Sequence, residues 1–229
     1  MSRILVRTLL KFLMLASTTA LVQAAPALEW QQMPAEKFRE LPEVNAQIDF
    51  ANYDRGLMAA AIFHETNRVR QQLHLRPFQH LPKLDEAADL QANISALLPN
   101  FSHENPMPDL RDASDRVRSV GLKGGQVGEN IALTMALDGE NKNASIGIRS
   151  EGVRRVFFDP QTGRELAPRT YAAFATEVVQ QWMNSPHHRA NIVCQNAEYL
   201  GCSARWRKDY SGVDLLYSVQ VFFTPQTDR

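Results

Sequence analysis

Four side chains of this sequence are of types that could do acid–base chemistry or hold a divalent cation: His103, Glu129, Glu177 and His188. The first histidine follows an expected helix, and Glu129 lies in a Gly-Glu-Asn turn. Glu177 is on an apolar-striped segment, and His188 follows the Ser-Pro break that ends it. Taken singly, each has a structural explanation, since such residues commonly cap helices or face solvent. Chemistry requires a fold that brings them together.

Patterns typical of other hydrolases are incomplete. His64-Glu65 begins like a zincin motif but lacks a second histidine at the required spacing. The sequence has no Gly-x-Ser-x-Gly elbow of an α/β hydrolase. Ser102 and Ser185 stand near the candidate histidines, but neither lies on an identifiable strained turn. A serine nucleophile is therefore a weak alternative.

Helical periodicity dominates the first part of the chain that must position these side chains. Apolar residues recur at helical spacing from Met58 until Pro77, and again from Pro82 to Pro99. A shorter helix is expected over 110–120. A fourth holds Phe174, Val178 and Trp182 before the Ser-Pro break, with a short turn continuing to Ile192.

Strand patterns dominate the end of the chain. Apolar and polar residues alternate over 200–206 and 215–223, and the second run is apolar on both faces, so we expect it to be buried on both sides. Residues 128–133 predict a short extended or helical stretch, and 153–158 with 165–171 predict a hairpin around a five-residue turn. Helices first and strands last indicate an α+β fold.

The first 24 residues have the order of a secretory signal. Arg3, Arg7 and Lys11 precede an apolar run over 12–21, and small residues flank Gln23. The run is shorter than the roughly 20 residues that span a bilayer, although a retained membrane anchor stays open as an alternative. No lipobox cysteine follows it. We expect a periplasmic or secreted protein without stable membrane insertion after cleavage, with an extended lead-in segment over 25–52.

The charge of the expected mature chain argues against a nucleic-acid partner. Removal of residues 1–24 takes away three basic and no acidic side chains, which leaves 22 basic and 25 acidic ones and a net charge of −3. Nucleic-acid binders usually carry clustered Lys and Arg. The remaining 205 residues can bury one substantial core, so one domain is expected.

The sequence has two cysteines, Cys194 and Cys202, with seven residues between them. In an oxidising compartment this spacing predicts a disulfide, which would contribute roughly 2–3 kcal/mol by constraining the unfolded chain. Two buried free thiols are the alternative. Two cysteines are too few for a zinc knot.

Six sequence blocks, in order, resemble the signature of bacterial CAP domains, the superfamily of cysteine-rich secretory proteins, antigen 5 and pathogenesis-related 1. The resemblance covers residues 54–223, within an expected domain at 53–224. The blocks are Asn67 with Arg70, Ser102-His103, Gly128-Glu129-Asn130-Ile131, Glu177-Val178-Val179 with Trp182-Met183-Asn184-Ser185-Pro186, His188-Arg189-Ala190-Asn191-Ile192, and Tyr217-Ser218-Val219-Gln220-Val221-Phe222.

The resemblance implies a three-layer α-β-α sandwich with a central, largely antiparallel sheet and a cleft. It also implies that His103, Glu129, Glu177 and His188 line the cleft and that the two histidines contact a metal. Zinc or another divalent cation suits this donor set, with Glu129 and Glu177 as candidate catalytic carboxylates. Without a metal, such a cluster could still serve acid–base chemistry.

The chain departs from the family pattern in three places. His187 replaces the common glycine before the second histidine, and we expect its side chain to face solvent. The segment 138–170 is a longer connection than usual, near the cleft. The cysteine pair is not the multi-disulfide set of eukaryotic relatives. We expect Asn130, Arg189 and Asn191 to hold loops by hydrogen bonding.

Four functions are compatible with these residues, and the sequence does not decide whether the protein is an enzyme. The leading hypothesis is an extracytoplasmic binding module whose cleft takes a divalent metal and a small ligand or envelope component. The alternatives are a metal-assisted hydrolase acting on peptide or cell-envelope material, a lipid or sterol carrier, and an interacting protein that uses the 138–170 insertion.

Overall fold

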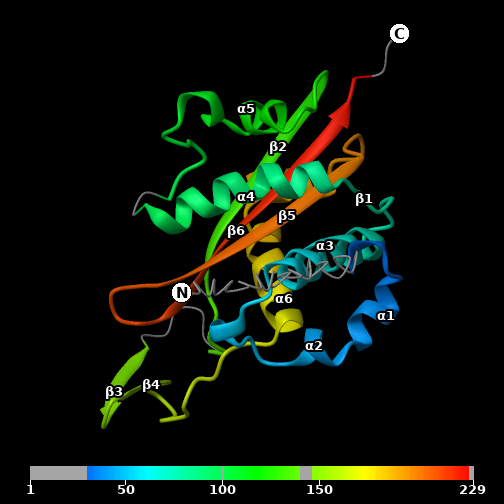
Figure 1. Cartoon of the computed structure of the whole chain (residues 1–229). Helices are drawn as coiled ribbons and strands as arrows, with labels where there is room; N and C mark the ends of the chain where they lie inside the picture. Colours follow the sequence, from blue (N-terminus) through cyan, green and yellow to red (C-terminus); the bar gives the residue numbers. More distant parts are fainter. Residues whose placement is uncertain (1–29, 99–100, 140–145, 227–229) are drawn as a thin grey trace, which may run out of the picture.

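The computed structural model describes residues 30–98, 101–139 and 146–226 and has three layers (Figure 1). A four-stranded sheet lies between helices on both faces. This arrangement confirms the predicted α+β sandwich. The predicted signal peptide, residues 1–24, lies outside the described residues. Within the described ranges, no helix has the length and apolar character needed to cross a membrane.

The sheet has the strand order β1-β5-β6-β2. Strand β1 pairs in parallel with β5, whereas β5 with β6 and β6 with β2 are antiparallel, so the sheet is largely antiparallel as expected. Edge strand β2 pairs with β6 along its whole length. The strand bounds are β1 Gln79–His80, β2 Gly125–Met135, β5 Tyr199–Lys208 and β6 Asp214–Pro225.

Alternation along β6 creates two separate cores, one on each face of the sheet. Val219, Val221 and Phe223 pack on one face with Leu84 and Val117. The intervening positions face the other layer, where the larger core contains, among others, Leu216, Phe222, Ile62, Phe174 and Trp182. The central strand is therefore buried on both sides, as its apolar pattern predicts.

The helices begin and end close to the signals in the sequence. The Asp54 side chain accepts from the Leu57 amide at the start of α3, and Thr170 accepts from the Ala173 amide at the start of α6. Proline occupies the first turn of α4 and α7. The bounds are α3 Arg55–Gln72, α4 Pro82–Leu97, α5 Ala113–Ser119, α6 Tyr171–Met183 and α7 Pro186–Val193.

The described part of the lead-in segment differs from the extended chain that we expected. It forms short helices that include α1 (Ala35–Glu40) and α2 (Pro42–Asn45). Phe38, Val44 and Ile48 are buried in the larger core. Phe38 stacks on His64 of α3, with ring centroids 4.3 Å apart. Tertiary contacts of a few apolar side chains therefore make this segment part of the domain.

The insertion contains a hairpin, but not the one predicted. Strand β4 (Arg154–Phe158) pairs with the preceding β3 (Gly147–Glu151). The expected second strand, 165–171, contributes only an isolated bridge between Glu165 and Phe158 and a few backbone hydrogen bonds. The five-residue turn is present, closed by the Gly163 amide donating to the Asp159 carbonyl at 2.7 Å.

The two cysteines are free thiols, so the predicted disulfide is wrong. Cys194 is half-buried directly after α7, whereas Cys202 is buried within β5, opposite Gln220 of β6. Because different elements position the two residues, closeness in sequence does not give the geometry that a disulfide needs. Burial, together with the charge of Asp85, raises the pKa of the Cys202 thiol well above its usual value.

Candidate functional site

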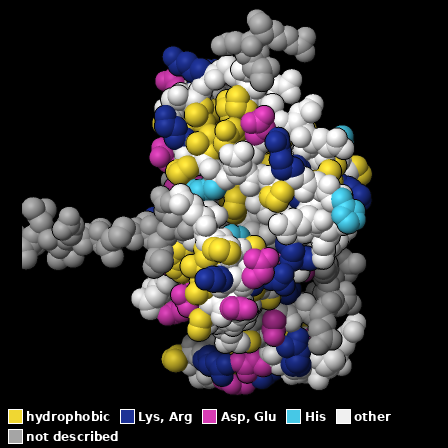
Figure 2. Space-filling model, turned by 90° about the vertical axis from the view of Figure 1, so that its right-hand side faces the viewer, with side chains coloured by type: hydrophobic (Ala, Val, Ile, Leu, Met, Phe, Trp, Pro, Cys, Tyr) yellow, Lys and Arg dark blue, Asp and Glu magenta, His cyan; other side chains and the backbone are white. Residues whose placement is uncertain are grey.

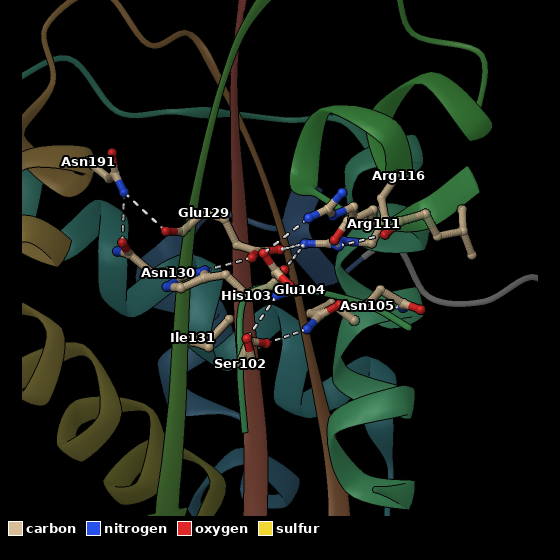
Figure 3. A network of polar contacts seen from close by, with 12 residues as sticks. Ser102, His103, Glu104, Asn105, Arg111, Arg116, Glu129, Asn130, Ile131 and Asn191 are labelled. Atoms are coloured by element: carbon tan, nitrogen blue, oxygen red, sulfur yellow. Dashed lines mark hydrogen bonds and ion pairs between the residues drawn. The ribbon is translucent and has the colours of Figure 1, made fainter. Parts of the chain in front are cut away.

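The predicted site begins at Glu129 on edge strand β2. Its Oε1 lies 2.8 Å from Nδ1 of His103, and its Oε2 accepts from Nη2 of Arg116 at 2.5 Å. The glutamate side chain is 4% exposed and that of His103 is 53% exposed. Figure 3 shows Glu129 between the histidine and the guanidinium. The carboxylate thus connects a buried cation to an exposed imidazole.

Arg116 of α5 is fully buried and holds the loop that carries His103. Its Nη1 donates to the carbonyls of Leu110 and Arg111, at 2.9 and 3.2 Å, and its Nη2 donates to the His103 carbonyl at 3.4 Å. The same loop is fixed from α4, where Gln91 donates to the Ser102 carbonyl at 2.6 Å. The position of His103 is therefore set by both helices of one layer.

His188 reaches β2 from the opposite layer, on α7. The Asn130 amide nitrogen donates to the His188 carbonyl at 3.1 Å and to Oε1 of Gln220 at the same distance. Asn191 donates to Oδ1 of Asn130 at 2.9 Å and to the Glu129 carbonyl at 3.2 Å. These contacts support the structural roles expected for Asn130 and Asn191, whereas Arg189 is exposed.

Gly128 lets α7 approach the strand this closely. A Cβ at this position would lie 3.0 Å from Oδ1 of Asn191. Such a contact is tighter than ordinary van der Waals distance, so a side chain here would push on the Asn191 amide that donates to β2. The glycine of the Gly-Glu-Asn block thus has a packing reason.

The two histidines meet at the free edge of β2. Their ring centroids are 6.4 Å apart and their planes are inclined by 44°. Burial lowers the pKa of His188 from its usual value, and positive charge on His103 and His187 lowers it further. His187 is exposed, as we expected. His103, Glu129 and His188 are thus brought together from three elements.

Glu177 is not in contact with this trio in the described structure. It lines a cavity of about 340 Å³ with seven other residues, none of which is His103, Glu129 or His188. Its Oε2 lies 4.0 Å from Nη2 of Arg169. Within the described ranges, no three His, Cys, Asp or Glu side chains converge so as to surround an ion. The expected quartet is therefore gathered as a trio and a separate glutamate.

The other sequence candidates have structural roles. His64 is buried, with Nε2 2.7 Å from the Trp30 carbonyl, and Glu65 pairs with Arg68. The Ser102 hydroxyl accepts from the Glu104 amide, and Ser185 precedes the first turn of α7. Within the described ranges, neither serine side chain is hydrogen-bonded to a histidine side chain.

Sequence reasoning missed Arg116, the residue that orients Glu129. One signal was available: an arginine lies directly before Val117 and four residues before Val120, on the expected inward face of the short helix. A charge at such a position needs a buried partner.

Charged side chains on the surface are mixed in sign on the face shown in Figure 2. Basic and acidic groups are interspersed there, whereas hydrophobic side chains gather mainly in the upper part of the view.

Solved structures with a similar fold are distant in sequence. An extracellular protein containing an SCP domain from Bacillus anthracis str. Ames is 19% identical, with a TM-score of 0.48, over 74% of this chain and 41% of that one. An outer surface protein from Borrelia burgdorferi is 14% identical, with a TM-score of 0.44, over 72% and 90%. A cysteine-rich secretory protein from Staphylococcus aureus subsp. aureus Mu50 is 13% identical, with a TM-score of 0.41, over 74% and 39%. The chain thus spans about two fifths of the Bacillus and Staphylococcus proteins.

The family assignment comes from sequence. No curated protein matches the chain. A family model described as the cysteine-rich secretory protein family, CAP, matches residues 63–222. This range is more than half of the 229 residues and contains every element that positions the trio. The chain therefore belongs to the cysteine-rich secretory protein (CAP) family.

Proposed function

We propose that the protein binds a divalent transition metal ion, zinc by preference, through His103 and His188, and presents it to a small ligand outside the cytoplasm. The observation that supports this best is the bonding of Glu129. One of its oxygens pairs with the buried Arg116, and the other lies 2.8 Å from Nδ1 of His103. A carboxylate behind a histidine is the usual outer contact of a metal-binding imidazole.

This arrangement fixes the tautomer of His103. Because Glu129 is ionised beside a guanidinium, it can only accept, and the N–H of His103 Nδ1 donates a hydrogen bond to it. The lone pair of a neutral imidazole is then on Nε2, the nitrogen that a metal needs. Glu129 is thus a positioning residue for His103 rather than a ligand.

The second histidine lies near the first but not yet at ligating distance. Zinc–nitrogen bonds of about 2.0–2.1 Å in tetrahedral geometry place two ligating imidazole centroids about 5 Å apart, and the observed separation is 6.4 Å, so the two rings must move closer by about 1 Å to share an ion. Two protein ligands leave further positions for water or a ligand atom. We therefore expect weaker binding than in a closed structural site, and an ion that can act as a Lewis acid when bound.

The hydrolase alternative has less support. Both oxygens of Glu129 are engaged, and Glu177 lines a cavity that does not include the histidines. A water-activating carboxylate at the proposed ion would require one of them to move. A lipid or sterol carrier is also less favoured, because an apolar ligand in that cavity would lie against the charged side chains of Arg169 and Glu177.

Metal titration calorimetry with Zn²⁺, combined with elemental analysis, tests the proposal. We expect wild-type protein to bind one ion, the His103→Ala/His188→Ala variant to bind none, and His187→Ala, an exposed neighbour, to bind as wild type. Glu129→Gln should weaken binding about 10- to 100-fold, the usual effect of losing an outer contact. Equal zinc binding by wild type and the double variant would overturn the proposal.

The extracytoplasmic location is proposed from the basic start, apolar run and small-residue site of residues 1–24. Expression of the full chain in a bacterial host, followed by fractionation and mass spectrometry, tests it. We expect the protein in the periplasm or medium with Ala25 as its first residue. Recovery in the cytosol with residues 1–24 intact would contradict this location.

A further inference from the structure

Arg169 is half-buried and makes fewer hydrogen bonds to the described residues than the two buried arginines do. Arg70 donates three hydrogen bonds to carbonyls at 2.6–2.9 Å, and Arg116 makes four, one of them to a carboxylate. Within the described ranges, Arg169, whose side chain is 16% exposed, donates one bond of 3.3 Å to the Gly139 carbonyl and lies 4.0 Å from Glu177. Its Nε is buried without a partner, as is that of Arg116. A cation that is largely withdrawn from water and has few acceptors is costly.

Two side-chain amides on exposed residues line the same cavity as Arg169. The Gln181 side chain accepts from the Thr134 hydroxyl at 2.7 Å, and Asn184 accepts from Gln180 at 2.9 Å, each through its oxygen. The amide nitrogen of each therefore remains accessible as a donor to a ligand. Among the described lining residues, these two amides and the Arg169 guanidinium are the side-chain N–H donors.

We propose that this cavity binds an α-carboxylate that is flanked by an N–H donor. Arg169 and the two amide nitrogens would donate to the carboxylate, a group that suits a guanidinium fork. Glu177, 4.0 Å from Arg169, would accept from the neighbouring N–H. The C-terminus of a peptide and a free amino acid share this chemistry. A cavity of about 340 Å³ is in the range of small-ligand sites.

This proposal does not depend on the two-histidine site. The cavity is formed by the end of β2, the start of the insertion and one side of α6, and its lining includes neither His103 nor His188. Loss of metal binding in the His103→Ala/His188→Ala variant would leave the cavity unchanged. The two proposals can therefore fail separately.

Calorimetric titration of the purified full chain with three probes tests the inference: N-acetyl-trialanine, the same peptide with an amidated C-terminus, and L-alanine. We expect the free carboxylate of the peptide to be required, so that the amide binds at least about tenfold more weakly. Binding of L-alanine as well, lost in Glu177→Gln, would identify the free amino acid as a source. Binding of the acetylated peptide alone would identify the peptide C-terminus.

Variants locate the binding. Arg169→Gln should weaken peptide binding about tenfold or more, and Arg169→Lys should retain part of it because the charge remains. Arg76→Gln, the same substitution at an exposed arginine outside the cavity, should bind as wild type. Equal affinity for the acid and the amide, no binding of any probe, or wild-type affinity in Arg169→Gln would overturn the proposal. If Arg169→Gln does not fold, the acid–amide comparison on wild type decides.

Discussion

A buried ion pair stands behind the exposed histidine of the site. Arg116 is 0% and Glu129 4% exposed at their side chains, and their closest atoms are 2.5 Å apart. Removal of one partner from such a pair leaves an uncompensated buried charge, which is more damaging than loss of the pair itself. The stability of the domain and the orientation of His103 therefore depend on the same two residues.

We expect Arg116→Met to lower the free energy of unfolding by about 3–5 kcal/mol. The double variant Arg116→Met/Glu129→Gln should lose less than the sum of the single changes, because no charge stays buried alone. Arg118→Met, on the same helix at an exposed surface pair, should change stability by about 1 kcal/mol or less. Urea unfolding of Arg116→Met, Glu129→Gln, the double variant and Arg118→Met measures these losses. If the loss in the double variant equalled the sum of the two single losses, Arg116 and Glu129 would not be energetically coupled.

A second buried residue should make the protein sensitive to mild acid. Burial lowers the pKa of His64; its bond to the Trp30 carbonyl raises it, His80 lowers it and Glu36 raises it, with a net decrease from 6.5. The unfolded chain therefore takes up a proton at higher pH than the folded one. The resulting stability is fully present above about pH 6.5 and is lost as the pH falls from there through the lower folded pKa.

Thermal unfolding of wild type and His64→Gln between pH 7.5 and 5 tests this sign. Glutamine keeps a side-chain N–H donor but does not titrate in this range. We expect the wild type to lose more stability than the variant over this interval. Equal slopes, or a steeper slope for the variant, would show that His64 is not the source.

Helix α4 approaches the sheet very closely at a glycine. A Cβ on Gly201 of β5 would lie 2.3 Å from the Asp85 backbone nitrogen and from the Leu84 backbone carbon of α4. Helix α4 therefore rests directly on the strand, where no side chain can intervene. This contact fixes the layer that carries Gln91 and the loop of His103.

We expect Gly201→Ala to destabilise the protein by about 1–3 kcal/mol or more, since strand and helix must separate. Gly56→Ala is the control, because a Cβ at that α3 position would lie 3.4 Å from Oδ1 of Asp54, an ordinary contact, and alanine favours helix by up to about 1 kcal/mol. Urea unfolding compares them. A Gly201 variant as stable as wild type would contradict the close contact.

Helices and strands in which apolar residues recur at a regular spacing could be predicted from sequence, and those without such spacing could not. Helices α3, α4 and α6 and strands β5 and β6 agree with the expected segments because apolar residues recur along each of them at helical or strand spacing. The hairpin was shifted because β3 is largely exposed and has no apolar alternation. The lead-in helices depend on burial of Phe38 against His64, a contact between distant parts of the chain.

The site was predictable in composition but not in arrangement. Sequence blocks identified His103, Glu129 and His188, which the structure brings together at the edge of β2. They did not separate Glu177, because its direction depends on which side of α6 faces the insertion. Arg116 was missed because its partners come from other elements. Pairwise contacts of this kind are fixed by packing, not by spacing.

At the scale of the molecule, the two cores and not a covalent link hold the layers together. One core joins α3, α6 and α7 to the sheet, and the other joins α4 and α5. Both cysteines are free and belong to, or pack against, the larger core. The stability of the fold should therefore not depend on whether a reductant is present.

We expect two thiols per chain to react with a disulfide-forming reagent after denaturation without reductant. In the native protein the half-buried Cys194 should react before the buried Cys202, whose pKa is raised. The melting temperature should be the same with and without reductant. If no thiol reacted, or if the melting temperature fell on reduction, the two cysteines would form a disulfide after all.

The borders of the sheet give another strand little continuous backbone for pairing. Strand β1 has only two residues, which gives a second chain little to extend. On β2, two carbonyls are already used by side chains of neighbouring helices: the Trp182 indole donates to that of Ile131, and Asn191 donates to that of Glu129. Short or occupied edges are how β proteins avoid edge-to-edge association. The hydrogen bonds that hold α6 and α7 against the sheet thus also hinder a second molecule from pairing with this part of β2.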